Sequence, residues 1–100
     1  MPRRAIVGGV TFEDAFAITP SDTVNIVADA GNVQGYPHCY LMNVAAGATV
    51  RVIPAGSITG TAVTVYIPQG GICPLAVSRV FNTTPTPPAG LVGLVNFKPA

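Results

Sequence analysis

Short runs of alternating apolar and polar residues cover most of the chain. In residues 48–53 the valines occupy one face, and Thr49 and Arg51 occupy the other. Residues 61–67 alternate in the same way, and both runs are rich in the β-branched residues that favour pleated sheets. The same reasoning predicts further strands over residues 15–18, 25–28, 38–44, 76–82 and 91–97. Residues 72–75 are expected to run along a sheet edge, because Pro74 has no amide hydrogen to donate.

Turn-forming residues separate these runs. Thr19-Pro20-Ser21-Asp22 is a strong turn signal, and residues 83–90 form a loop with three closely spaced prolines. Residues 45–47 are predicted to join 38–44 to 48–53 as a β-hairpin. About six to eight short strands at this spacing predict an all-β fold, an antiparallel β-sandwich or jelly-roll-like small barrel.

The first residues differ from the rest of the chain. Residues 1–14 are predicted to be an extended N-terminal arm and residues 15–100 a single β domain, although 11–16 also resemble a helix start. The apolar run after Arg4 is too short for a signal peptide. No unbroken apolar stretch of about 20 residues predicts a membrane helix. We therefore expect a protein that is made and used without export.

Charge is scarce, and it is unevenly placed. Hydrophobic residues make up 49% of the chain and charged residues 9%, with a formal net charge of +1. Between Asp29 and Lys98 the charged side chains are Arg51 and Arg79 alone. A dense basic patch is missing, so nucleic acid is not an expected partner, whereas near-zero net charge favours self-association. Cys39 and Cys73 are expected to be buried, reduced thiols.

Residues for catalysis are equally scarce. His38 is the single histidine, and its neighbour Cys39 would point to the opposite face of a strand, so the two cannot form a nucleophile–base pair. One histidine and two cysteines lack the spacing of a zinc site. The sequence therefore predicts no catalytic, metal or cofactor site.

Candidate partner contacts come from two other sources. Arg3 and Arg4 precede the apolar residues Ile6 and Val7 on an arm that can reach a neighbour's sheet edge. Tyrosines combine an apolar ring with a polar tip, which suits protein interfaces. The candidates among them are Tyr36, Tyr40 and Tyr66.

Two ordered elements resemble a known family. The run Ala17-Ile18-Thr19-Pro20-Ser21-Asp22-Thr23-Val24-Asn25 is followed in mid-chain by Thr49-Val50-Arg51-Val52 and Pro68-Gln69-Gly70, and then by Val77-Ser78-Arg79-Val80. Thr83-Thr84 and a final strand at 91–95 complete the pattern. In this order the elements resemble head spike base proteins of tailed phages and gene transfer agents, which are related to capsid decoration proteins. The arm 1–14 and the proline-rich segment 84–88 depart from that pattern.

The resemblance implies a non-enzymatic structural virion protein without a cofactor. Its partners would be copies of itself, as a trimer or pentamer, the major capsid protein, and a spike or fibre protein, but neither nucleic acid nor membrane. Its location would be the capsid exterior after assembly in the host cytoplasm. Arg79, from the matched element, would satisfy loop carbonyls or a neighbour's carboxylate.

Two other functions stay open at this stage. The first is a small carbohydrate- or receptor-binding module of a phage fibre, with Tyr36, His38 and Tyr40 as its site. The second is a head–tail or tail component, which would share the chemistry of the decoration protein and differ in its position in the particle.

Overall fold

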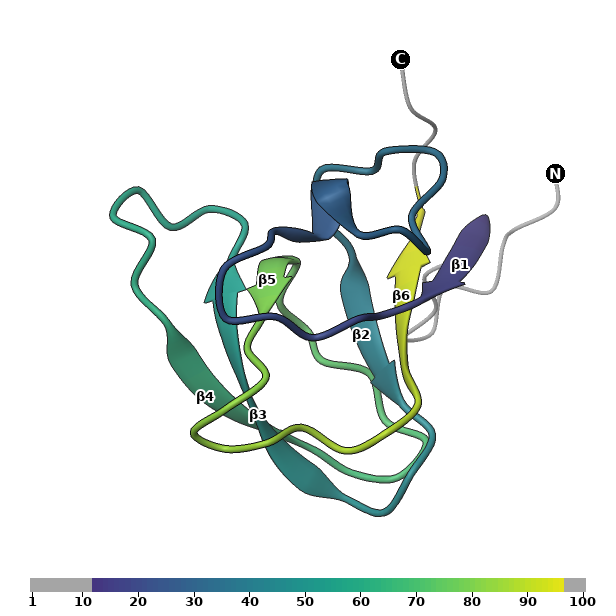
Figure 1. Ribbon diagram of the computed structural model, residues 1–100. Coiled ribbons are helices and arrows are strands. Elements are labelled where there is room, and N and C mark those ends of the chain that lie inside the picture. Colours follow the sequence, from purple (N-terminus) through teal and green to yellow (C-terminus); the bar gives the residue numbers. More distant parts are fainter. Residues whose placement is uncertain (1–11, 97–100) are drawn as a thin grey trace, which may run out of the picture.

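The computed structural model describes residues 12–96 of the chain (Figure 1). The prediction of an all-β fold is confirmed, with six described strands and one short 3-10 helix. The elements are β1 (Asp14–Ala17), η1 (Ile26–Ala28), β2 (Tyr40–Asn43), β3 (Ala48–Pro54), β4 (Val63–Ile67), β5 (Val77–Val80) and β6 (Leu91–Val95). The alternative of a helix start at residues 11–16 is wrong for its described part, because residues 12–13 are not helical and β1 is extended from Asp14.

The strands form two antiparallel three-stranded sheets. Sheet A has the order β1-β6-β2 and sheet B the order β4-β3-β5. The two sheets meet where Cys39 and Val77 exchange backbone hydrogen bonds of 3.1 and 2.8 Å. Beside this bridge, the Cys73 amide donates to the Leu41 carbonyl at 2.8 Å, so residues 72–73 run along edge strand β2 as expected. The six strands therefore form one series, with β1 at one end and β4 at the other.

The predicted hairpin of residues 38–53 is wrong. β2 pairs with β6, and β3 pairs with β4 and β5, so these consecutive strands belong to different sheets. The buried side chain of Asn43 holds the connection between them. Its amide donates to the carbonyls of Ala46 and Ile67 at 3.0 Å each, and its oxygen accepts the Ala45 amide at 3.0 Å. These bonds turn the chain from one sheet into the other.

The strand predicted at residues 25–28 is also wrong. Those residues contain η1, in which the Asp29 amide donates to the Ile26 carbonyl at 3.0 Å. Asp29 then accepts the amides of Thr19 at 2.7 Å and Gly31 at 2.8 Å. Only Ile26 of η1 is buried, so one apolar side chain is taken into the core while the backbone folds into a turn.

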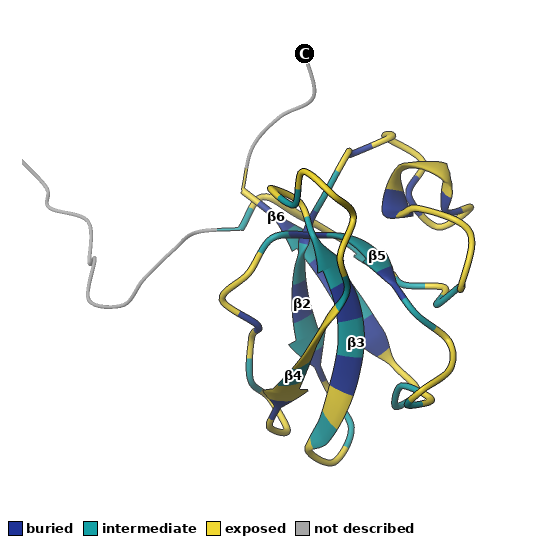
Figure 2. Ribbon diagram, turned by 90° about the vertical axis from the view of Figure 1, so that its left-hand side faces the viewer, coloured by how far each residue is buried: buried dark blue, intermediate teal, exposed yellow. Residues whose placement is uncertain are grey.

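The core lies between the two sheets, where the buried positions of the strands alternate with less buried ones (Figure 2). Residues with side chains in this core are Leu41, Val50, Val52, Ile67, Val77, Val80, Leu91 and Val95. Gly93 faces inward as well, because a Cβ there would lie 2.9 Å from the Cys39 sulfur and 3.0 Å from the Phe16 ring. The alternation leaves one outer face on each sheet.

Candidate interaction surface

Within the described strands of sheet A, none of the outward side chains is charged. Residues paired across antiparallel strands share a face, so the register of β1, β6 and β2 identifies the outward positions. The first row of outward residues is Ala15, Leu94 and Tyr40, and the second is Ala17, Val92 and Met42. All six are partly or fully exposed to solvent. We call this set the apolar face.

The outer face of sheet B is polar. Its register places Thr49 beside Tyr66, Arg51 beside Thr64, and Ile53 beside Arg79. The guanidinium carbon of Arg51 lies 4.3 Å from the centre of the Phe81 ring, and that of Arg79 lies 5.7 Å from it. The two arginines therefore share one aromatic ring through cation–π contacts. We call this set the polar face.

The two motif elements behind the family resemblance are hydrogen-bonded to each other. The Arg79 guanidinium donates from Nε to Asn25 Oδ1 at 2.8 Å and from Nη1 to the Asp22 carbonyl at 3.2 Å. Arg79 thus satisfies a loop carbonyl, which is one of the two roles expected for it. Segments more than 50 positions apart in the sequence are joined in this way at one end of sheet B.

Asp22 extends this junction to the loop after β5. Its carboxylate accepts the Thr83 hydroxyl at 2.9 Å and the amides of Asn82 and Thr83 at 2.9 and 3.2 Å. The hydrogen bond from the Thr83 hydroxyl, followed by that from the Asn82 amide, lowers the pKa of Asp22 below its ordinary value. The sequence predicted Asp22 as a turn residue. In the structure its carboxylate also joins two loops through these hydrogen bonds.

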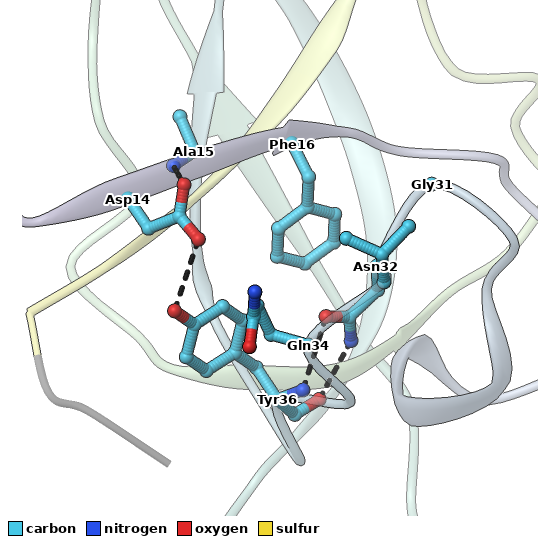
Figure 3. Close-up of a pocket in the computed structure, with 8 residues that line it drawn as sticks. Asp14, Ala15, Phe16, Gly31, Asn32, Gln34 and Tyr36 are labelled. Carbon is cyan, nitrogen blue, oxygen red and sulfur yellow. Dashed lines mark hydrogen bonds between the residues drawn. The ribbon is translucent and has the colours of Figure 1, made fainter.

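Tyr36 lies against a small pocket beside β1 (Figure 3). The pocket measures about 200 Å³, and Phe16, Asn32 and Gln34 are among the residues that line it. The Tyr36 hydroxyl donates to Asp14 at 2.9 Å, and its ring stacks on Phe16 with centroids 6.3 Å apart. Burial, followed by this bond to Asp14, raises the pKa of Tyr36. The two oxygens of the Asp14 carboxylate each accept one hydrogen bond, from the Ala15 amide and from the Tyr36 hydroxyl, so Asp14 fixes the Tyr36 ring beside the pocket.

The three tyrosines proposed as contacts differ in exposure. Tyr36 is 6% exposed and belongs to the core, so it does not join His38 and Tyr40 in an exposed, coplanar platform. Tyr40 is half-buried on the apolar face, where the Phe12 ring meets it edge-on at 5.8 Å. Tyr66 is 65% exposed on the polar face. Its hydroxyl lies against Gly47, where a Cβ would collide with it.

Four further candidates, Arg3, Arg4, Ile6 and Val7, lie outside the described residues. The first described residue after them is Phe12, whose ring contacts the Tyr40 ring of the apolar face edge-on. The chain therefore leaves the described structure beside this face.

Both cysteines are buried free thiols. Burial, followed by the nearby Asp29 carboxylate, raises the pKa of Cys39 to about 12, which keeps the thiol protonated. Within residues 12–96, no three histidine, cysteine, aspartate or glutamate side chains are grouped as ligands for a metal ion. In the same range no helix has the length and hydrophobicity needed to cross a membrane.

Local patterning did not single out the apolar face as a contact surface, although its signal is present in the sequence. Residues 91–95 are apolar or glycine at every position, which is typical of a strand covered on both sides. In the structure one side of β6 packs into the core, and the other, with Val92 and Leu94, is part-exposed. The mismatch between that pattern and the observed exposure marks the face as a candidate interface.

Comparison with known proteins adds no relative: no family model matches the chain, and neither the curated proteins nor the solved structures contain a match.

Proposed function

We propose that this chain is a non-enzymatic structural protein of a tailed-phage particle, a capsid decoration or head-spike-base module that assembles with copies of itself on the major capsid protein. The observation that carries the proposal is the uncharged apolar face on a chain of 100 residues. Its large side chains are half-buried and its two alanines are exposed, so part of this apolar surface stays in contact with water and can be covered by a partner.

The arrangement of the motif elements supports the same proposal. The resemblance to head spike base proteins rests on Thr19–Asp22 and Val77–Val80, and Arg79 binds these two elements together. The described residues around them form hydrogen bonds that brace loops. A rigid module with an apolar face suits assembly better than chemistry.

Burial of the apolar face supplies the driving force in this proposal. Each Å² of apolar surface removed from water contributes about 25 cal/mol, and a symmetric assembly repeats every contact. Many modest contacts with a capsid lattice then add through avidity. The proposed partners are therefore sister subunits and the major capsid protein, with a spike or fibre protein as a further partner.

Leu94→Lys tests the proposal, with Thr49→Lys as the matched control on the polar face. Light scattering would measure the mass of the assembly, and co-sedimentation would measure binding to capsids that lack this protein. A lysine in the middle of the apolar face should weaken assembly or capsid binding by roughly 100-fold, because an unpaired charge is costly to bury. Thr49→Lys should change neither. A wild-type chain that remains monomeric and ignores capsids would contradict the proposal.

A further inference from the structure

The two ends of the strand series differ in how their outer edges are covered. At β1, the outward amide of Ala15 is taken by the Asp14 carboxylate at 2.8 Å, and that of Thr19, just beyond the strand, by Asp29 at 2.7 Å. Gly31 also approaches the Ala17 carbonyl closely enough that a Cβ would lie 2.8 Å from it. The edge of β1 is therefore blocked by side chains and by a loop.

Among the described residues, none covers the edge of β4 in this way. The Arg51 carbonyl accepts the Phe81 amide at 2.9 Å, so the backbone groups of Arg51 point away from β4. Because Arg51 pairs with Thr64, the backbone groups of Thr64 and, two residues on, Tyr66 point outward. Among residues 12–96 no group accepts a hydrogen bond from these two amides, and Figure 2 shows most of β4 as exposed.

The sequence of β4 makes this edge receptive. Val63–Ile67 contains no charge and no proline, and the β-bulge of sheet B lies between β3 and β5. Native proteins usually protect an edge strand with one of these devices. Without them, an open edge accepts an added strand through main-chain hydrogen bonds.

We propose that the edge of β4 receives the segment 5–10 of a second copy of this chain as an added antiparallel or parallel strand. This inference rests on the proposed assembly function and names its contact. The segment Ala-Ile-Val-Gly-Gly-Val is uncharged and rich in β-branched residues, like the strand it would join. It belongs to residues 1–11, which precede the described residues. A fully extended segment of that length spans roughly 36 Å.

The position of β1 favours a second copy over the chain's own arm. In Figure 1, β1 and β4 lie on opposite flanks of the molecule, and the arm precedes β1. A donor on one flank and an acceptor on the other make a head-to-tail contact, in which each copy gives one strand and receives one. Such contacts close into rings when the rotation between copies permits. The inference therefore links the arm to the trimer or pentamer of the proposed function.

Amide hydrogen exchange on the full-length chain tests this inference. In the assembled wild type, the Thr64 and Tyr66 amides should exchange at least about tenfold more slowly than in the double variant Ile6→Pro, Val7→Pro, whose arm cannot complete a ladder. The Val63, Val65 and Ile67 amides point toward β3 and serve as internal controls, with equal protection in both proteins. Equal exchange of Thr64 and Tyr66 in the two proteins would overturn the inference.

A mixing experiment identifies the donor. Isotope-labelled double variant, mixed with unlabelled wild type, should regain protection at Thr64 and Tyr66, because a wild-type arm would occupy its edge. Protection that stays absent after mixing, but is present in wild type alone, would assign the edge to the chain's own arm and overturn the inference.

An edge variant separates this contact from the proposed function. Thr64→Pro removes one outward amide while sparing the β3–β4 ladder, and Thr64→Val is its matched control. The proline variant should lower the mass of the assembly and the valine variant should not. If wild type forms a capsid-binding assembly whose Thr64 and Tyr66 amides exchange freely, only this inference fails. If wild type is a monomer without capsid affinity, the proposed function fails as well.

Discussion

The outer faces of sheets A and B are built from similar strands but have opposite character. The apolar face presents alanine, valine, leucine, methionine and tyrosine side chains, and no charge. The polar face presents threonines and both arginines that lie between Asp29 and Lys98. The charge deficit of the chain is therefore concentrated on one side of the domain.

This difference indicates which of the two outer faces is suited to contact with water. Threonine and arginine on the polar face keep their polar groups solvated while their aliphatic parts cover the sheet. The apolar face has no group of this kind. In the proposed assembly, the polar face of sheet B therefore stays in water, and the apolar face of sheet A is covered by partners.

The largest effect is expected from Asn43→Ala, because Asn43 holds the two sheets in their relative positions. The change leaves the Ala46 and Ile67 carbonyls and the Ala45 amide without the side-chain partner. The free energy of unfolding should fall by about 3 kcal/mol, which denaturant titration measures. A decrease below about 1 kcal/mol would show that the sheets hold their places without Asn43.

A smaller effect is expected from Arg79→Ala on the polar face. The variant loses the bonds to Asn25 and to the Asp22 carbonyl, and one cation–π contact with Phe81. These interactions are exposed to solvent, so thermal unfolding should show a loss of about 1 kcal/mol or less. Unchanged melting and unchanged assembly would remove any structural role for Arg79.

An isosteric exchange compares the two faces directly. Val92→Thr places a hydroxyl on the apolar face, and Thr49→Val removes one from the polar face. Each change should alter monomer stability by about 0.5 kcal/mol or less, as expected for surface positions. Retention on a hydrophobic-interaction column should fall for Val92→Thr and rise for Thr49→Val. Equal retention of both variants and wild type would mean that the two faces do not differ in solution.

The smallest effect is the acid dependence that comes from Asp22. Its pKa in the folded protein is lowered from the ordinary value of 3.8, chiefly by the hydrogen bond from Thr83. The stabilisation is complete above the unfolded pKa and is lost as the pH falls through the folded pKa. Asp22→Asn should flatten the decline of melting temperature below pH 4, a limit set by that ordinary value. The same slope in both proteins would assign the acid sensitivity to other carboxylates.

Local patterning predicted the sheet-forming segments well, with residues 25–28 as the exception. It failed on pairing, because β2 joins β6, about 50 positions away, and the short link expected at 45–47 suits a hairpin as well as a passage between sheets. Local patterning also placed Tyr36 at an interface. Its burial depends on Phe16 and Asp14, which only the folded chain brings to it.

The two buried thiols can be used to measure how often the core opens. Cys39 is 0% and Cys73 2% exposed, and a pKa of about 12 leaves Cys39 almost no reactive thiolate at neutral pH. A thiol reagent therefore modifies Cys39 only when the core around its sulfur opens. The rate at which Cys39 is modified measures how often that opening occurs, with no label added to the protein.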